Sequence, residues 1–288
     1  MSGKLAEIEA RSATARQLDA VIGAMRGIAA ARAREAQRRL PGIRSSAATV
    51  GAAIGAALAH GRAGEAPASP PAHGARIVIA LCSEQGFVGS FNERVLDRVK
   101  ACFDRAPCEL LLVGTRGEIV ASERHLPFVW YAPAAAHADD MSSLAGRITD
   151  ALYGHIENRA VDRVSVVHAL PGVASSSDVV ERRLIPFDFS RFRMDGHAQP
   201  PLLTLPAESL LAGLVEAYVF VEICEALMLS FAAENEARVR AMLAARANVK
   251  DTLDELTQNY RRVRQDEITA DIAELATAAM QPVWPTPG

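Results

Sequence analysis

The sequence is poor in aromatic residues and has no large excess of charge of either sign. Aromatic residues make up 5% of its 288 residues, and the formal net charge is −3. A low aromatic content with abundant alanine favours closely packed helices over a bulky β-sandwich core. Nucleic-acid binders usually carry a clear basic excess, so the charge argues against that class. Half of the residues are hydrophobic, which is ample material for one large domain or two modest ones.

Cysteine and histidine are too scattered to form a metal site. The chain has no C-x-x-C pair, no H-x-x-x-H pair and no cysteine near histidine at zinc-ligand spacing. We therefore expect no metal and no cofactor, and we expect the cysteines to be reduced and mostly buried. His168 lies in an apolar strand and is expected to be a core residue. The four cysteines are Cys82, Cys102, Cys108 and Cys224.

The N-terminus does not look like a signal peptide, and the window 210–233 does not look like a membrane span. The N-terminal residues 1–17 lack an apolar run. The most hydrophobic window, 210–233, carries Glu216, Glu222 and Glu225, three carboxylates that would be costly in lipid. We expect a soluble protein in which this window is a packed helix.

Proline is absent from a long stretch near the C-terminus. Between Pro206 and Pro282 lie 75 residues, which contain a single glycine. A continuous helix of that length would be about 110 Å long, more than a globular domain of this size needs. Its apolar positions alternate in steps of three and four, the spacing of a coiled-coil seam, so a partner is expected to surround it. The seam positions are Val239, Met242, Arg246, Val249, Leu253, Leu256, Tyr260 and Val263, after which they shift to Ile268, Ile272 and Leu275.

A second long helix is expected from about Leu5 to Leu58, with a kink or break at Pro41-Gly42. Residues 1–60 carry a net charge of +5 and residues 208–281 a net charge of −6. Opposite charges suit two segments that pair, so we expect the first and last helices to pack antiparallel. The predicted N-terminal seam is Ile8, Arg11, Ala15, Leu18, Ile22, Met25, Ala29 and Arg32.

The middle of the chain alternates strand-like and helix-like segments, which predicts a largely parallel sheet covered by helices, Rossmann-like in outline. Strands are expected at Arg76–Cys82, Glu109–Val113, Phe128–Tyr131, Arg163–His168 and Val179–Ile185, and helices at Phe91–Phe103, Thr115–Glu123 and Asp140–Asn158. The fold class is therefore α/β with a long antiparallel coiled coil. The predicted parts are an N-terminal helix at 1–60, a linker at 61–75, the α/β domain at 76–206, a C-terminal helix at 207–281 and a proline-rich tail at 282–288.

The most enzyme-like feature is the segment 82–92, which follows the first strand and opens a helix, where phosphates often bind. It matches neither G-x-G-x-x-G nor the P-loop pattern, and it has no P-loop lysine, so a structural turn is the favoured interpretation. Gly114–Gly117, Ser175–Ser177 and the carboxylates Asp139, Asp140 and Glu181 also have structural explanations. The chain is therefore expected to lack catalytic residues.

The C-terminal helix resembles the signature of ATP synthase gamma subunits. Residues 234–248 read ENEARVRAMLAARAN, followed by Glu255-Leu256 and by YRRVRQDEIT at 260–269. Ala24-Met25, Ile28 to Ala30, Arg34 and Ala36-Gln37 resemble the family's N-terminal helix. The pattern Ser83-Glu84-x-Gly86-x-x-Gly89-x-x-Asn92 resembles its first strand–turn motif.

This resemblance implies a rotor whose coiled coil stands inside a ring of three alpha and three beta subunits. Its α/β domain would lie against the epsilon subunit and the membrane-embedded c-ring. It also implies a non-catalytic, peripheral subunit at the cytoplasmic face of the bacterial plasma (inner) membrane, without a membrane span of its own. No nucleic-acid partner is implied.

Residue by residue, the resemblance gives Arg264 and Gln265 the family role of engaging a loop of the beta subunit. Met25, Glu234, Arg238 and Thr269 match positions that affect coupling, although a methionine on a seam is usually just packing. The departures from the family pattern are Ala20, Gly23, Gln85, Ser90, Asp271 and Ala278. They suggest a divergent, second-copy synthase, and one version of this hypothesis has it moving sodium.

Two other readings stay open. One is a nucleotide-binding enzyme with a coiled-coil arm, which predicts nucleotide affinity through residues 82–92. The other is a coiled-coil scaffold unrelated to ATP synthesis. The group Arg261–Arg264 suits an acidic protein partner better than a nucleic acid, because the helix around it is net acidic.

Overall fold

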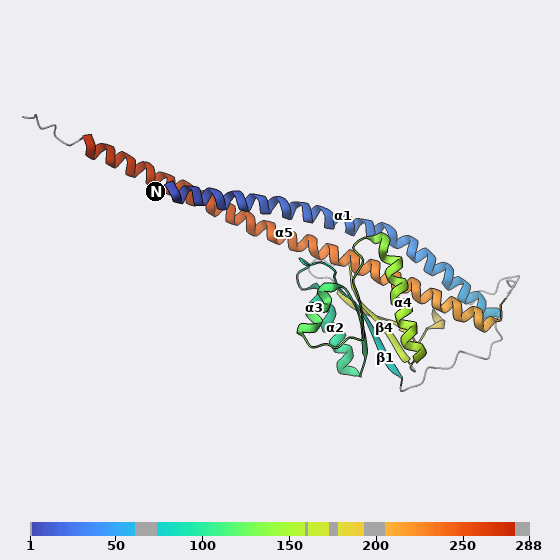
Figure 1. The fold of residues 1–288 in the computed structure, drawn as a ribbon. Coiled ribbons are helices and arrows are strands. Elements are labelled where there is room, and N and C mark those ends of the chain that lie inside the picture. The colour runs from blue at the N-terminus through green and yellow to red at the C-terminus, as the bar shows by residue number, and fades with distance from the viewer. Residues whose placement is uncertain (1, 61–73, 159–160, 173–177, 193–204, 280–288) are drawn as a thin grey trace, which may run out of the picture. The chain divides into compact units, whose positions relative to one another are not determined.

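The computed structural model describes residues 2–60, 74–158, 161–172, 178–192 and 205–279 (Figure 1). The chain divides into two compact units. Residues 28–241 form the first, called the body unit below. Residues 1–27 and 242–288 form the second, called the end unit. Each is described by itself.

Two long helices contribute to both units: α1 (Ser2–His60) and α5 (Ala207–Ala279). In the body unit, Gln37 donates to Glu236 at 3.0 Å and Arg44 to Glu225 at 2.8 Å. Residue numbers therefore rise along α1 as they fall along α5, so the helices are antiparallel. In the end unit, Arg246 of α5 donates to Asp19 of α1 at 2.9 Å. The expected pairing of the first and last helices is confirmed.

The side of α1 that faces α5 differs in part from the predicted seam. Ile8, Ile22 and Ala29 are buried, as predicted, but Arg11 is exposed and Leu18 is 50% exposed. Those two positions were wrong. Asp19 takes the inner position beside Leu18 because its carboxylate pairs with Arg246, so a charged residue replaces the apolar one that a hydrophobic pattern selects.

The break expected at Pro41 does not occur, because α1 runs through it. A proline inside a helix removes one backbone hydrogen bond and leaves the carbonyl four residues earlier, here that of Gln37, without its partner. Pro41 lies on the exposed side of α1, where water can solvate that carbonyl. The adjacent turns are held by the buried Ala36 and Leu40. The helix therefore tolerates the proline.

The body unit contains a five-stranded mixed sheet with the order β3-β2-β1-β4-β5. The neighbours among the first four strands run parallel, and β5 runs antiparallel to β4. The sheet is thus largely parallel, as predicted. Its strands are β1 (Ala75–Leu81), β2 (Glu109–Val113), β3 (Trp130–Ala132), β4 (Val161–Leu170) and β5 (Asp178–Ile185).

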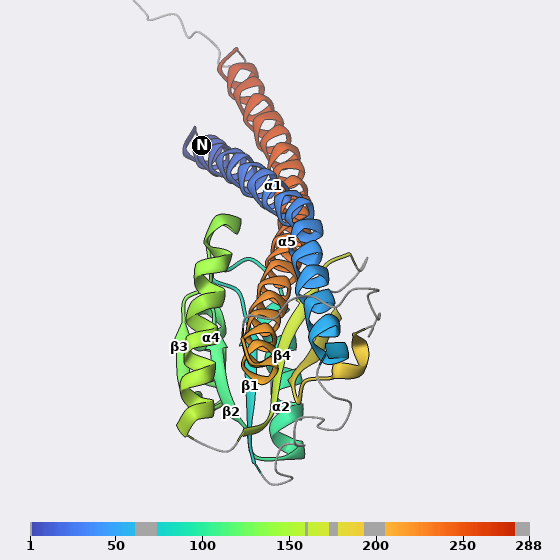
Figure 2. The same cartoon turned by 90° about the vertical axis from the view of Figure 1, so that its right-hand side faces the viewer.

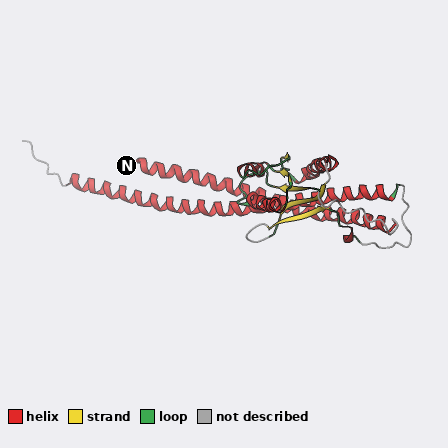
Figure 3. Cartoon of the chain, turned by 90° about the horizontal axis from the view of Figure 1, so that it is seen from below, coloured by secondary structure: helices red, strands yellow, loops and turns green. Residues whose placement is uncertain are grey.

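Helices cover both faces of this sheet (Figures 2 and 3). The inner parts of α5 and α1, with α4 (Met141–Asn158), pack on the face that receives Ile77, Ile79 and Leu81 of β1. On the other face, α2 (Phe91–Arg105) and α3 (Thr115–Glu123) cover Val78 and Ala80. This alternation along β1 follows from the two-residue period of a strand. Two short 3₁₀ turns, η1 (Ala138–Asp140) and η2 (Phe189–Arg191), complete the described elements.

By length and composition alone, α1 contains a window apolar enough to cross a membrane, with a mean hydropathy of 1.2. Core helices of soluble proteins pass the same test. The window carries no argument about a membrane span.

Candidate functional site

The turn that follows β1 closes on itself through side-chain hydrogen bonds. Asn92, in the first turn of α2, accepts from the backbone N–H of Ser83 at 2.9 Å and donates to the Ser83 hydroxyl at 2.9 Å. That hydroxyl donates in turn to the Gln85 carbonyl at 3.1 Å. Gly89 has φ +59°, a left-handed conformation that glycine adopts at little cost. The segment is a structural turn, as the sequence favoured.

Glu84 ties this turn to two other loops of the body unit. Its carboxylate accepts from the backbone N–H and the hydroxyl of Thr115, at 3.1 and 2.7 Å, and from the backbone N–H of Ala134 at 2.7 Å. The carboxylate therefore joins the ends of β1, β2 and β3 at one edge of the sheet. Both oxygens of the Glu84 carboxylate therefore accept hydrogen bonds that hold these loops together.

Arg238 of α5 fastens the same turn to the long helix. Its guanidinium donates to the carbonyls of Gln85 at 3.1 Å and Gly86 at 3.2 Å. It also pairs with Glu234, one helical turn earlier, at 2.7 Å, and donates to Asn235 at 3.1 Å. The planar guanidinium suits this role because it presents several donors in a fixed geometry. We call Glu234, Arg238 and the turn 83–92 the upper latch.

The upper latch is buried, and its electrostatics depend on both charges being present. Glu234 and Arg238 are both nearly inaccessible to solvent. Burial raises the pKa of Glu234 above its usual value, while the adjacent Arg238 guanidinium opposes that shift. Removing one partner of such a pair leaves an uncompensated buried charge, which typically costs about 3–5 kcal/mol.

The six residues predicted as coupling positions fall into two groups. Glu234 and Arg238 are internal contacts of the body unit. Arg264, Gln265 and Thr269 are exposed in the end unit, and Met25 is half-buried there. The Thr269 hydroxyl donates to the Gln265 carbonyl within α5 at 2.8 Å, so it is engaged with its own helix.

Neither a metal-ligand cluster among the described residues nor a ligand-sized cavity beside the upper latch is found. No group of three or more His, Cys, Asp or Glu among them is placed to hold a metal ion. The hollow nearest the upper latch has a volume of about 20 Å³, room for about one water molecule and for no larger ligand. His168 is buried in β4, as predicted. Ser175–Ser177 lie outside the described residues.

Comparison with known proteins identifies the family. A family model described as ATP synthase matches residues 4–280. A gamma chain of ATP synthase from Frankia casuarinae is 28% identical over 304 residues, which cover 97% of this chain and 98% of the relative. The gamma chain from Halothermothrix orenii is 29% identical over 209 residues, covering 70% of this chain and 72% of the relative. The chain belongs to the ATP synthase gamma-subunit family.

Solved structures show the same fold in this gamma subunit and in distant ones. The rotor of Euglena gracilis mitochondrial ATP synthase superposes with a TM-score of 0.65 at 11% identity, covering 93% of this chain and all of the other. The central stalk and c-ring structure from Tetrahymena thermophila contains a chain with a TM-score of 0.56 and 21% identity, covering 78% of this chain and 99% of the other. A gamma subunit is a non-catalytic part of the synthase. The structural roles of Glu84, Glu234 and Arg238 described above agree with this.

Sequence analysis missed a second polar cluster of this gamma subunit. Arg182 of β5 contacts Glu222 and Glu225 of α5, and Glu225 also pairs with Arg44 of α1. Two carboxylates in the most hydrophobic window were visible in the sequence. A buried carboxylate requires a cationic partner, and the adjacent arginines at 182 and 183 were the available signal.

Proposed function

We propose that this gamma subunit is the rotating central shaft that couples ion flow through a membrane-embedded c-ring to ATP synthesis or hydrolysis. The shaft performs no chemistry. An asymmetric shaft contacts each of three catalytic beta subunits differently, so each orientation favours a different conformation in each of them. Rotation then changes their affinities for ADP, phosphate and ATP through differential contacts.

The observation that carries this proposal is the apolar surface of the end unit. Large apolar side chains that usually avoid water lie open on α5, with Ile268, Ile272 and Leu275 exposed by 50, 61 and 70%. Leu18 and Val21 are exposed on α1. An accumulation of exposed apolar side chains marks a surface that another protein covers. A ring of alpha and beta subunits around the paired helices supplies such a cover.

Within that surface we propose Arg264 and Gln265 as the residues that engage a beta-subunit loop, with Thr269 and Met25 nearby in the same interface. A guanidinium and an amide side by side provide directional donors for carboxylates and carbonyls. Glu234 and Arg238 are proposed to affect coupling from inside the body unit, by fixing the turn 83–92 against α5.

We further propose the remaining partners and the location that the family suggests. The α/β domain would contact the epsilon subunit and the c-ring, at the cytoplasmic face of a bacterial plasma membrane. The coupling ion is proton or sodium, and a divergent second-copy synthase remains our hypothesis for the departures at Gln85, Ser90 and Asp271. Reconstitution into liposomes tests the ion: unchanged activity without sodium would end the sodium version.

The rival function, a nucleotide-binding enzyme, finds little support in the turn 83–92. The side chains of Ser83, Glu84 and Asn92 and the carbonyls of Gln85 and Gly86 already bond within the chain. Titration of the isolated chain with ATP tests this directly, and saturable binding that depends on the turn would favour the enzyme.

Co-assembly is the decisive experiment for the proposed function. The chain, produced with alpha and beta subunits, is expected to purify in a complex with three of each. Arg264→Ala and Gln265→Ala are expected to weaken hydrolysis or assembly without loss of nucleotide binding by the beta subunits. The matched control is Arg262→Ala, an exposed arginine two positions earlier on another side of α5. A chain that never enters such a complex would contradict the proposal.

A further inference from the structure

A cluster of charged side chains around two largely buried carboxylates joins four elements of the body unit. The Arg182 guanidinium on β5 contacts the Glu222 carboxylate and lies 2.9 Å from that of Glu225, both on α5. Arg44 of α1 reaches the other Glu225 oxygen at 2.8 Å. Arg191 of η2 approaches Glu222 at 3.6 Å. We call these five residues the lower latch.

The two carboxylates of the lower latch are shielded from water, whereas the side chains of Arg44 and Arg191 are 61 and 46% exposed. The side chain of Glu222 is only 4% exposed and that of Glu225 12%. Burial works to raise the pKa of Glu225, but hydrogen bonds from Arg44 and Arg182 outweigh it and hold the pKa below its usual value. Glu225 is therefore held as a charged, hydrogen-bonded partner of Arg44 and Arg182.

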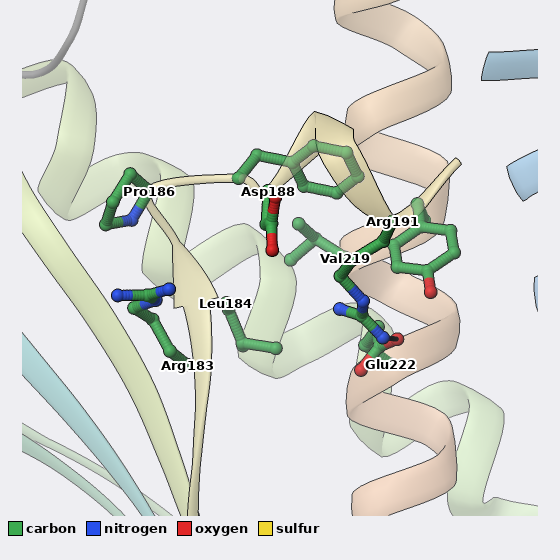
Figure 4. A pocket seen from close by; sticks show the side chains of 9 residues that line it. Arg183, Leu184, Pro186, Asp188, Arg191, Val219 and Glu222 are labelled. Carbon is green, nitrogen blue, oxygen red and sulfur yellow. Dashed lines mark ion pairs between the residues drawn. The ribbon is translucent and has the colours of Figure 1, made fainter. Parts of the chain in front are cut away.

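Aromatic side chains, called the cap below, lie beside a cavity that is lined by Arg191 and Glu222 of the cluster (Figure 4). Tyr218 of α5 meets the rings of Phe187 and Phe192 edge to face, at 5.4 and 5.1 Å. Gly51 of α1 lies so close to Phe192 that a Cβ there would come within 2.9 Å of its ring. The cavity between the cap and Glu222 has a volume of about 110 Å³. Phe187 and Tyr218 line this cavity together with Arg191 and Glu222, so the aromatic rings border the contact between those two charged residues.

Stability alone does not explain such a cluster. Well-packed apolar side chains of similar volume are often as stabilising as a buried ion pair, or more so, because the charges lose their hydration. Charged pairs instead fix one geometry, since their hydrogen bonds are directional while apolar attraction is not. Elsewhere, the inner part of α5 meets the sheet through apolar residues such as Ile223 and Leu227. Polar contacts between α5 and the sheet include the hydrogen bond from the Ser230 hydroxyl to the Leu81 carbonyl of β1, at 3.2 Å, and the ion pairs of the lower latch with β5.

We propose that Arg182, with Glu222 and Glu225, is a rotational lock that makes the α/β sheet and the helical pair turn together. The inference rests on the proposed rotor function. Torque applied to the α/β domain has to reach α5 without the helix rolling on the sheet. Arg182 is the link in this latch that bridges β5 to α5, whereas Arg44 only joins the two helices.

The test measures ions pumped per ATP hydrolysed by the whole synthase reconstituted in liposomes. Proton uptake is followed with a pH-sensitive dye, and sodium uptake with a radiotracer, for whichever ion the unmodified complex moves. Arg182→Gln is expected to retain hydrolysis while pumping per ATP falls about fivefold or more, the lower end of typical coupling between sites. Arg182→Lys keeps the positive charge and is expected to recover most of the pumping.

The matched control is Arg105→Gln. Arg105 lies in α2 and pairs at 3.3 Å with Glu181, the neighbour of Arg182 in β5. This ion pair joins the sheet to α2 and not to a long helix, so its loss is expected to leave pumping per ATP unchanged. If Arg182→Gln fails to fold, Glu225→Gln serves instead, because it removes the carboxylate to which Arg182 is hydrogen-bonded on α5, while Glu222 still neutralises the arginine and pumping per ATP is expected to fall. Unchanged pumping in the lock variants, or an equal fall in Arg105→Gln, overturns the inference. If the unmodified chain neither assembles nor pumps, the proposed function itself fails.

Discussion

At the scale of single residues, Gly117 occupies the point where α3 comes closest to β1. A Cβ at this position would lie 2.2 Å from the Cβ of Cys82 and 2.6 Å from its sulfur. Both are short, rigid neighbours, so Gly117→Ala is expected to destabilise the chain by about 1–3 kcal/mol, the usual cost of overpacking. Urea unfolding measures this.

The control for that substitution is Gly146→Ala on α4. An added Cβ there meets nothing within 4 Å, so the variant is expected to stabilise the chain by about 0.5–1 kcal/mol through helix propensity. Equal effects at the two glycines would show that the contact with Cys82 does not limit position 117.

His168 links stability to pH. Burial lowers its pKa from 6.5 to about 4 in the folded chain. Between those values the unfolded chain binds a proton that the folded chain does not, so stability is complete above pH 6.5 and falls as the pH drops toward 4. From pH 7 to pH 5 the loss attributable to this group is about 2 kcal/mol. Unfolding of the chain and of His168→Gln at both pH values should show the difference, and parallel pH profiles would refute it.

The role of a single residue could be predicted where its chemical type allows only one kind of environment. A histidine in an apolar strand had to be neutral and buried, and His168 is. Arg238 was recognised as important from its family pattern, but its role as a buried donor to the turn 83–92 depends on a contact across 152 residues of chain. Local sequence carries no signal for such a contact. The lower latch was missed for the same reason.

At the scale of elements, Pro41 is the position where α1 departs most from ideal helix chemistry. Pro41→Ala would restore the backbone N–H and its bond to the Gln37 carbonyl. We expect a gain of about 1–3 kcal/mol in the free energy of unfolding, since proline inside a helix costs about 3 kcal/mol relative to alanine. The neighbouring Gly42→Ala, also exposed, is the comparison and should gain no more than about 1 kcal/mol. A loss of stability in Pro41→Ala would mean that the proline's geometry is required.

The positions of the helices and strands could be predicted from the sequence. The residues of α1 that face α5 could be predicted only in part. Glu109–Val113 and Thr115–Glu123 form a strand and a helix with the predicted bounds. Hydrophobic spacing located both long helices, yet it chose Leu18 over Asp19 for the seam. A salt bridge to a helix 227 residues away decided that position, and spacing within one helix contains no information about it.

At the scale of the whole molecule, substitutions at the apolar end of α5 are expected to affect binding to other subunits without affecting the stability of the free chain. Replacing Ile268, Ile272 and Leu275 together by glutamine removes exposed apolar surface only. Each change is expected to alter the free chain's stability by at most about 0.5 kcal/mol, because surface substitutions rarely do more. Binding to the alpha and beta subunits is expected to weaken, as measured by gel filtration of the mixed subunits.

Leu256→Ala provides the contrast. Leu256 is buried between the paired helices, so its truncation is expected to cost the free chain about 2–4 kcal/mol in urea unfolding. If the glutamine variant unfolded as readily as Leu256→Ala, the exposed residues would be part of the chain's own core, and the interface would lie elsewhere.

The antiparallel pairing of α1 with α5 also has a consequence for how the protein is made. Asp19 leaves the ribosome 227 residues before its partner Arg246, and at about 5–20 residues per second that delay is roughly 10–45 s. During this time the α5 residues that bury Ile8 and Ile22 in the folded chain have not yet been made, so both side chains are open to solvent. A holdase that shields early apolar helices would therefore raise the yield of this chain more than that of a protein whose neighbouring segments fold in order.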